Sequence, residues 1–187
     1  MPKVVDHALR RRQIAEAVHR LIDAHGIDRV SLREVAAEAG VSMGLVQHYF
    51  TTKDEMLLLA MEHLHLRITE RVGQVSGSPR EVLRAAILEL LPLDEVRRSE
   101  ARIGTAYLAR SVVAGDLARV LRDGLPFVLG FYAGVIGAIR PDLDAEREAS
   151  ALFAMAQGLV HPALIGYYGP EAVEAIVDGC LDRLFDG

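Results

Sequence analysis

The stretch Ser31–Lys53, SLREVAAEAGVSMGLVQHYFTTK, predicts two short helices joined by a tight turn. In its first half, apolar residues recur at the spacing that places them on one face of a helix, and Ser31 is positioned to cap that helix. Gly40 is expected to end the helix, because glycine readily takes the left-handed backbone conformation that turns the chain. Val41 then follows as an apolar side chain between the two helices.

The second helix of this stretch begins after Ser42, which is predicted to cap it. Val46 and Phe50 are four residues apart and are expected to point inward together. The remaining side chains are left for other surfaces, namely Met43, Gly44, Leu45, Gln47, His48 and Tyr49. A short helix with such a face, held at a fixed angle by the preceding helix, is what a DNA-reading helix-turn-helix requires in the major groove.

The spacing of several residues in and around this stretch resembles the DNA-binding head of the tetracycline-repressor (TetR) family. The residues that carry the resemblance are the run Val35–Ser42, Gly44, the run His48–Phe50 and the run Lys53–Leu57. It covers roughly residues 8–60, and the ending His48-Tyr49-Phe50 is similar to the branch that contains the choline-responsive betaine-pathway repressor. The chain departs from the family at Gln47, where the family often has Tyr, so the bases that are read are not carried over.

The helix-turn-helix and the resemblance together predict a surface that binds a double-stranded DNA operator. Gln47 can pair bidentately with adenine, and Leu45 can touch a thymine methyl group. Serine, tyrosine and lysine side chains at the edges of the motif are expected to hold phosphates. The predicted DNA-binding residues are Ser31, Ser42, Met43, Gly44, Leu45, Gln47, His48, Tyr49 and Lys53.

Composition and charge are those of a globular protein that works in a reducing compartment. The chain has 187 residues, 51% of them apolar, and a single cysteine, Cys180, which excludes an intramolecular disulfide framework. Its net charge is −5, but residues 1–53 contain eight Lys and Arg against six Asp and Glu, so this region carries +2 and the remainder −7. No signal peptide and no apolar run of about 20 residues is evident. We therefore expect a cytoplasmic protein without a membrane partner.

Helical periodicity continues along the whole chain, and no segment shows the alternation of a strand. The predicted fold is all-α, with a DNA-binding head at residues 1–52 and a ligand-sensing and dimerisation body at residues 53–187. One helix is expected before the motif, over about residues 6–25, and another after it, from Thr51 or Thr52 to about residue 72. The start of this second helix, together with Lys53, could hold a DNA phosphate. The body is expected to have helices over about residues 82–92, 94–114, 116–139, 144–165 and 170–185, with a kink or break near Gly124 and Pro126.

Two kinds of contact are expected in the body. The resemblance implies that the last two helices pair across a two-fold axis in a homodimer, which agrees with the wide apolar stripe on the last helix. The expected dimer contacts are Leu152, Leu159, Val173, Val177, Leu181 and Leu184. The resemblance also implies an unknown small-molecule effector. Its predicted contacts are Met61, His65, Tyr107, Phe127, Phe131, Tyr132 and Met155, which plain core packing would also explain.

A helical enzyme or small-molecule carrier with no DNA role is the alternative from another class. His63 and His65 are two residues apart and point to different helical faces, so they do not form the three- or four-residue spacing of a helical metal site. No serine elbow, phosphate-binding loop or dinucleotide-binding glycine pattern occurs. We therefore expect no catalytic residues, no metal and no cofactor, and a ligand-responsive transcriptional regulator that acts as a repressor.

Overall fold

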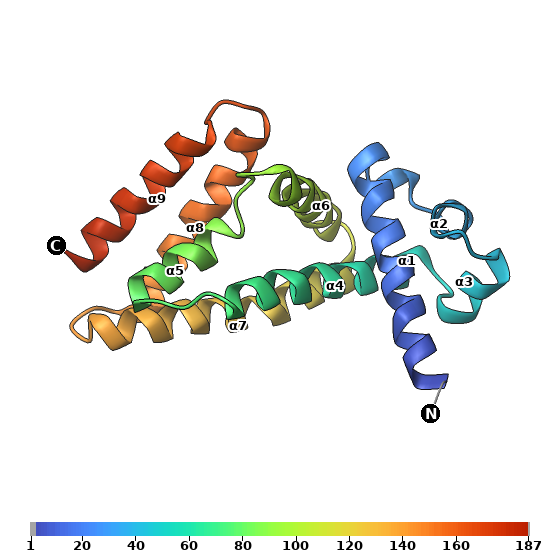
Figure 1. Ribbon diagram of the computed structural model, residues 1–187, viewed down its shortest axis with the longest axis horizontal. Coiled ribbons are helices and arrows are strands. Elements are labelled where there is room, and N and C mark those ends of the chain that lie inside the picture. Colours follow the sequence, from blue (N-terminus) through green and yellow to red (C-terminus); the bar gives the residue numbers. More distant parts are fainter. Residues whose placement is uncertain (1–2, 187) are drawn as a thin grey trace. The chain divides into compact units, whose positions relative to one another are not determined.

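The chain is built from α-helices, as the sequence predicts. The computed structural model describes residues 3–186, and the side chains of residues 7–186. No strand occurs within this range (Figure 1). The elements are α1 (Lys3–His25), η1 (Ile27–Arg29), α2 (Leu32–Ala39), α3 (Met43–Tyr49), α4 (Lys53–Gly73), α5 (Pro79–Leu88), α6 (Glu95–Ser111), α7 (Gly115–Ile139), α8 (Ala145–Leu164) and α9 (Pro170–Phe185).

These helices form two compact units. The first unit contains the described residues up to Arg67 together with Arg102–Val120, and the second contains Ile68–Ala101 and the described residues from Leu121 onward. Compactness therefore groups the first turns of α4 with the helices before it. The functional division predicted between residues 52 and 53 lies elsewhere in the chain and stays a prediction.

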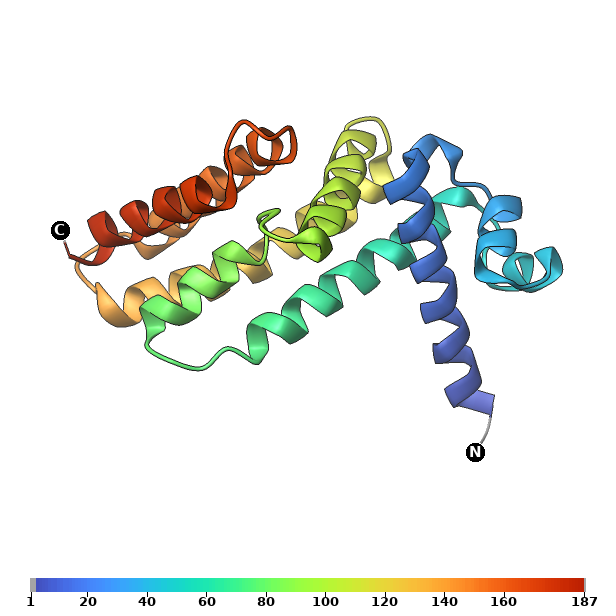
Figure 2. The ribbon, with the colours of Figure 1, turned by 45° about the horizontal axis from the view of Figure 1, so that its top comes forward.

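The first unit is organised around α1, with α2 and α3 on one side of it (Figures 1 and 2). Its apolar face supplies the core of this unit, including Ile14 and Val18, which are almost fully buried. Polar side chains fasten α1 to α2. The Gln13 amide donates to the Ala39 carbonyl over 2.7 Å, and the Arg20 guanidinium donates to the Glu38 carboxylate over 2.5 Å. These contacts fix the angle at which α2, and with it α3, is presented.

The start of α4 packs into the same core. Met56, Leu57 and Ala60 are completely buried, and the His19 ring of α1 lies 2.7 Å from the Ala60 carbonyl through its Nε2. Burial lowers the pKa of His19 to about 4, so the ring is neutral near pH 7 and its Nε2–H donates to the carbonyl. The His63 ring stacks beside it with centroids 5.9 Å apart. The first turns of α4 are thus held to α1 by buried contacts.

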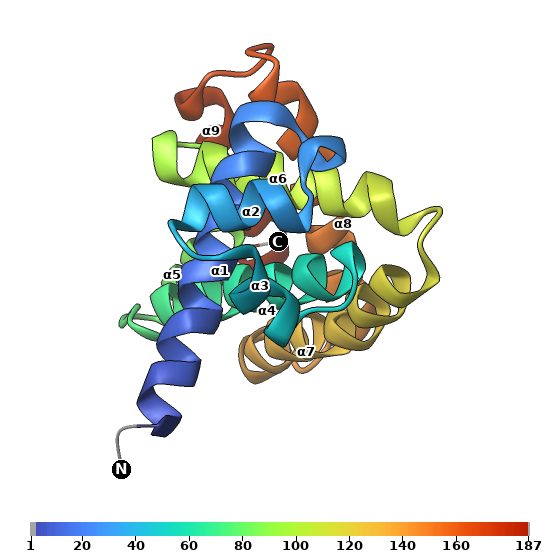
Figure 3. The same cartoon turned by 90° about the vertical axis from the view of Figure 1, so that its right-hand side faces the viewer.

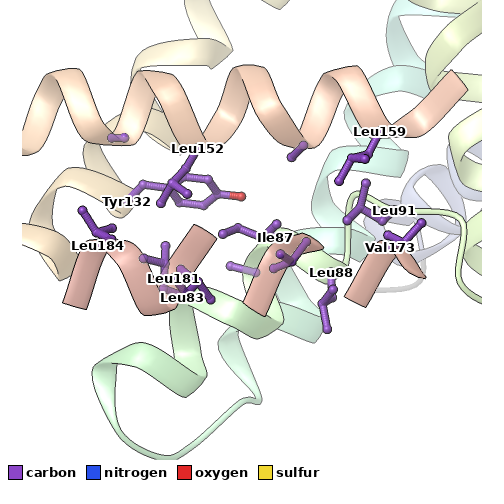
Figure 4. Packing of buried hydrophobic residues seen from close by; sticks show 14 of the residues in the cluster. Leu83, Ile87, Leu88, Leu91, Tyr132, Leu152, Leu159, Val173, Leu181 and Leu184 are labelled. Carbon is purple, nitrogen blue, oxygen red and sulfur yellow. The ribbon is translucent and has the colours of Figure 1, made fainter. Parts of the chain in front are cut away.

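The core of the second unit is formed by α5, α8, α9 and the later part of α7. Figure 4 shows part of this cluster, in which Leu83 and Ile87 of α5 lie among the apolar residues of α8 and α9. At the surface, the Arg84 guanidinium donates to both carboxylate oxygens of Asp178 over 2.5 and 2.9 Å and to Glu174 over 2.9 Å. A planar guanidinium suits such paired acceptors, so Arg84 fastens α5 to α9.

The structure differs from the prediction at Pro126, where a kink or break was expected, and at the end of the first body helix. Pro126 lies inside α7, which continues through it, so the chain does not break there. A proline inside a helix removes one hydrogen bond, and the following turns are held because Tyr132 and Ile136 are buried in the core. In contrast, α5 ends at Leu88 rather than at Pro92. After α5 the Leu90 N–H donates to the Ile87 carbonyl and the Leu91 N–H donates to the Leu88 carbonyl, which is a tighter turn than that of an α-helix. The helix ends here because Leu91 precedes Pro92, and a residue before proline disfavours the helical conformation.

By length and composition alone, α7 is apolar enough to cross a membrane. From the sequence we predict no apolar run of about 20 residues, and α7 differs from that prediction. Its first turns contain charged residues, which conceal the apolar run that follows. A single helix of this kind is weak evidence for a membrane span, since the core helices of globular proteins pass the same test.

Candidate DNA-binding surface

The turn between α2 and α3 has the geometry that the sequence predicts. Gly40 takes the left-handed conformation with φ 65°, and its N–H donates to the Ala37 carbonyl over 3.2 Å. The N–H of Val41 donates to the Ala36 carbonyl over 3.0 Å, which completes a Schellman motif. This arrangement satisfies the last carbonyls of α2 and reverses the chain within a few residues. It therefore fixes the start of α3 relative to α2.

The orientation of α3 is set by the two side chains that point inward. Val46 and Phe50 are buried, as predicted, and anchor α3 to the core of the first unit. Leu45 and Tyr49 are half-buried at its edges. The outer face carries Ser42, Met43, Gly44, Gln47 and His48, all exposed. Figure 3 shows α2 and α3 in the foreground. The short, mostly polar side chains leave α3 able to enter a DNA groove.

The two predicted capping serines differ in what their hydroxyl groups have left to donate. Ser31 accepts from the Glu34 backbone N–H over 3.2 Å and donates its own hydrogen to the Glu34 carboxylate over 3.1 Å. Ser42 is exposed and accepts from the Leu45 N–H over 3.2 Å. A cap needs only the oxygen, so the Ser42 hydrogen can still go to a phosphate. Ser42 is therefore the better phosphate donor of the two.

The start of α4 already holds an anionic group from the chain itself. Thr52 caps the helix by accepting from the Glu55 N–H over 3.2 Å, and the Glu55 carboxylate accepts from the Thr52 N–H over 3.4 Å and from the Thr51 N–H over 2.6 Å. This reciprocal arrangement is a capping box. An internal carboxylate thus occupies the Thr51 and Thr52 N–H groups, which precede α4, and a phosphate contact at the first turn of α4 itself stays a prediction.

Lys53 also has a partner within the first unit. Its ammonium donates to the Asp28 carbonyl over 3.2 Å, and partial burial lowers the pKa of Lys53. The side chain thus fastens the start of α4 to η1. An ammonium has three hydrogens, so a phosphate contact by Lys53 remains possible in geometry. Its loss would affect both the fold and any DNA contact.

One contact at this surface was not predicted from the sequence. The Tyr49 hydroxyl lies 2.8 Å from Nδ1 of His7 on α1, and the two rings meet edge to face with centroids 5.5 Å apart. The residues are 42 positions apart, so no local pattern in the sequence links them. Of the basic residues that follow on α1, Arg10 donates to Gln13 and Arg12 donates to Glu16, while Arg11 is exposed.

The predicted effector contacts are divided between the two units, and in the second unit the rings of Phe131 and Tyr132 lie with their centroids 6.1 Å apart. In the first unit Met61 and Tyr107 are buried, whereas His65 is exposed. In the second unit the four residues fall in different environments. They are Tyr132, 2% exposed in the core; Phe127, 63% exposed; Phe131, 38% exposed in a shallow depression beside Gly130 and Gly134; and Met155, in an open pocket of about 500 Å³ with Cys180 and Arg140.

Two of these residues bury a hydroxyl group without a partner. Neither the Tyr107 nor the Tyr132 hydroxyl makes a hydrogen bond to any residue that the structure describes. Burial raises the pKa of both hydroxyls, so both stay protonated and keep a hydrogen to donate. An unpaired buried hydroxyl costs free energy, which makes each a candidate contact for a polar group that is not part of the chain.

The predicted dimer contacts belong to the core of the second unit. All six residues are buried inside the protomer, and Figure 4 labels all of them except Val177: Leu152, Leu159, Val173, Val177, Leu181 and Leu184. Their apolar stripe is covered by residues of the chain's own α5 and α7, and their contact with a second copy stays a prediction. The outer faces of α8 and α9 carry other residues, including the exposed Ala151, Ala154, Gly158, Ala172 and Ala175.

Comparisons with known proteins agree with this architecture. Residues 14–60 match the family model described as bacterial regulatory proteins of the tetR family. Residues 79–186 match the model of the BetI-type transcriptional repressor C-terminal region. The HTH-type transcriptional regulator PksA of Bacillus subtilis (strain 168) is 33% identical over 171 residues, which cover 88% of this chain and 83% of PksA.

Solved structures share the fold over almost the whole chain. A transcriptional regulator from Rhodococcus sp. Rha1 superimposes with a TM-score of 0.87 at 35% identity, covering 95% of this chain and 96% of that one. A regulator from Saccharomonospora viridis, solved in complex with choline, superimposes with a TM-score of 0.76 at 24% identity, covering 96% and 95% of the two chains. With its glycine-turned helix-turn-helix and its helical body, the chain belongs to the TetR family of helix-turn-helix transcriptional regulators.

Proposed function

We propose that the protein represses transcription by placing α3 in the major groove of an operator. The observation that carries this proposal is the orientation of α3, whose Val46 and Phe50 are buried while Gly44, Gln47 and His48 face outward. Gln47 reads a base edge, with adenine as its expected partner. Ser42, Tyr49 and Lys53 contact phosphates at the edges of the groove.

The test compares a base-reading residue with a phosphate-binding residue. An operator is first selected from a pool of random-sequence duplexes, and the Kd of each variant is then measured at several salt concentrations. Gln47→Ala should weaken operator binding by about 1–3 kcal/mol and relax the preference at one base pair. Lys53→Gln should weaken all sequences alike and reduce the salt slope by about 0.9.

Because Lys53 also holds the Asp28 carbonyl, its variant needs a thermal melt as a control for folding. Failure of the selection to yield a common sequence, or an unchanged base preference in Gln47→Ala, would contradict the proposed docking.

We further propose that the protein is a homodimer through the outer faces of α8 and α9, with a near-palindromic operator. Small side chains such as Ala154 and Ala175 let two helix pairs approach closely, which supports this surface. Two recognition helices would then lie about 34–36 Å apart or further along the DNA. Ala175→Glu should give a folded monomer in light scattering, because this position is exposed in the protomer.

Matched variants separate the interface from the core. Ala24→Glu places the same charge on an exposed position of α1 and should remain dimeric. Val177→Glu buries a charge in the protomer and should lose the fold altogether. A monomeric unaltered protein at micromolar concentration would exclude this dimer.

The proposed switch is a small molecule in the body that lowers operator affinity. The buried hydroxyl of Tyr132 supports an effector that carries a hydrogen-bond acceptor, and α4 supports transmission because it contributes residues to both compact units. Mass spectrometry of the purified protein should identify a bound compound.

In calorimetry, a compound that weakens operator binding tenfold should bind about tenfold more weakly to the operator complex, a coupling of about 1.4 kcal/mol. Equal affinities in both titrations would exclude this mechanism.

We place the protein in the cytoplasm, where its DNA target lies, and assign it no enzymatic role. The names of its relatives, all transcriptional regulators, support both statements. Within the part of the chain that the structure describes, no group of three His, Cys, Asp or Glu residues is arranged to hold a metal ion.

A further inference from the structure

A histidine on the first helix contacts the tyrosine at the end of the recognition helix. His7 is exposed, Tyr49 is half-buried, and the hydroxyl oxygen of Tyr49 lies 2.8 Å from Nδ1 of His7. The edge-to-face contact of the rings, inclined at 70°, orients the tyrosine side chain further. Since Tyr49 is a predicted phosphate contact, whatever orients its hydroxyl affects DNA binding.

The direction of this hydrogen bond determines whether Tyr49 can bind a phosphate. If Nδ1 of His7 is unprotonated, it accepts the only hydrogen of the hydroxyl, and none remains for a phosphate oxygen, which can only accept. If Nδ1 carries a hydrogen, it donates to the hydroxyl oxygen instead. The O–H of Tyr49 is then available to donate outward, and such chains of hydrogen bonds reinforce one another.

We propose that His7 is a positioning residue for DNA binding, whose Nδ1–H donates to Tyr49 so that the tyrosine hydroxyl donates to a backbone phosphate. This rests on the proposed contact of α3 with DNA. A protonated imidazole carries hydrogens on both ring nitrogens, so protonation forces the binding-competent direction. DNA affinity is therefore higher when His7 is protonated than when its Nδ1 lacks a hydrogen.

Other titratable groups surround this pair and have to be separated from it. On α3 the His48 ring meets the Tyr49 ring edge to face with centroids 5.4 Å apart. On α1, Arg10 and Arg11 follow His7 by three and four residues, which places them on the same side of the helix. Because His48 is a second histidine in contact with Tyr49, the assignment to His7 depends on variants that leave His48 unchanged.

Two substitutions at His7 separate the hydrogen bond from the ring contact. His7→Asn supplies an amide N–H near the position of Nδ1, which donates to the Tyr49 hydroxyl without any charge. His7→Phe keeps the ring contact and removes the hydrogen bond. Each is also combined with Tyr49→Phe, which removes the hydroxyl. Because phosphate contacts act on all sequences, the probe is a random-sequence duplex of about 24 base pairs at low salt.

The expected results differ between these variants. The ratio of DNA affinity at pH 6 to that at pH 8 should be about three- to tenfold larger for the unaltered protein than for His7→Asn. His7→Asn should keep most of the pH 6 affinity at both pH values, and His7→Phe should show the weaker affinity at both. In the Tyr49→Phe background, both substitutions at His7 should have no further effect, because their effect passes through the hydroxyl.

Several results would overturn this inference. If His7→Asn bound as weakly as His7→Phe, the charge of His7 rather than the orientation of Tyr49 would matter. Additive effects of the His7 and Tyr49 substitutions would show that the two residues act independently. Equal binding by all variants would overturn this inference alone, whereas absence of DNA binding by the unaltered protein would overturn the proposed function as well. Melting temperatures should be equal throughout, because His7 is exposed.

Discussion

Replacement of Tyr132 by phenylalanine should stabilise the protein. The Tyr132 side chain is only 2% exposed, and its hydroxyl has no hydrogen-bond partner within the described residues. In the unfolded chain the same hydroxyl is hydrogen-bonded to water, so folding leaves it unsatisfied. Phenylalanine keeps the ring that fills the core of the second unit and removes the group that carries this cost.

The magnitude follows from the cost of an unsatisfied buried group, which is about 1–3 kcal/mol. A gain of about 2 kcal/mol raises the melting temperature of a chain of this size by roughly 4–8 °C. Urea unfolding is the more direct assay, because the free energy of unfolding should rise with an unchanged dependence on urea concentration. Tyr167→Phe is the matched control, since Tyr167 is 74% exposed and its hydroxyl reaches water in both states.

A Tyr132→Phe protein no more stable than the Tyr167→Phe control would refute this reasoning. It would mean that the Tyr132 hydroxyl is satisfied in the folded protein by water or by another molecule. If Tyr132→Phe is more stable and also responds more weakly to the effector, the hydroxyl has two roles. It destabilises the ligand-free protein, and it donates a hydrogen bond to the bound ligand.

Three further predictions concern stability. Burial lowers the pKa of His19 to about 4, so between about pH 6.5 and 4 the unfolded chain binds a proton that the folded chain does not. The free energy of unfolding should therefore be highest above pH 6.5 and fall by at most about 3 kcal/mol towards pH 4. The fall should be smaller in His19→Gln. Gly40→Ala should cost about 1 kcal/mol in chemical unfolding, because Gly40 has φ 65°, and Gly40→Asn should cost less. Arg84→Ala should destabilise the chain by about 1 kcal/mol, and Arg84→Lys should restore only part of this because lysine cannot bind both oxygens of the Asp178 carboxylate side by side.

Features with a local cause could be predicted from the sequence. The left-handed glycine, the serine caps and the inward direction of Val46 and Phe50 follow from residue types at spacings of three or four. The ends of α9, at Pro170 and Phe185, agree with the prediction because a proline and an apolar stripe mark them. The helix-turn-helix therefore needed little beyond local rules.

Features that depend on tertiary contacts could not be predicted. An apolar stripe shows that a helix face is covered, but not whether the chain's own helices or a second copy covers it. Val177 and Leu181 illustrate this, because the stripe that predicts a dimer contact for them is buried in the protomer core. The contacts of Lys53 with Asp28 and of Tyr49 with His7 join residues 25 and 42 positions apart, for which periodicity carries no information.

The buried hydrogen bond between His19 and the Ala60 carbonyl has a consequence for engineering. Hybrid regulators that combine the DNA specificity of one protein with the sensor of another require a joint in the chain. A joint after residue 52 would pair His19 with a carbonyl from a foreign helix, and foreign side chains would replace Met56 and Leu57 in the core of the first unit. A joint after Arg67 would transfer these partners together, so hybrids made there should express as folded proteins more often than those made at residue 52.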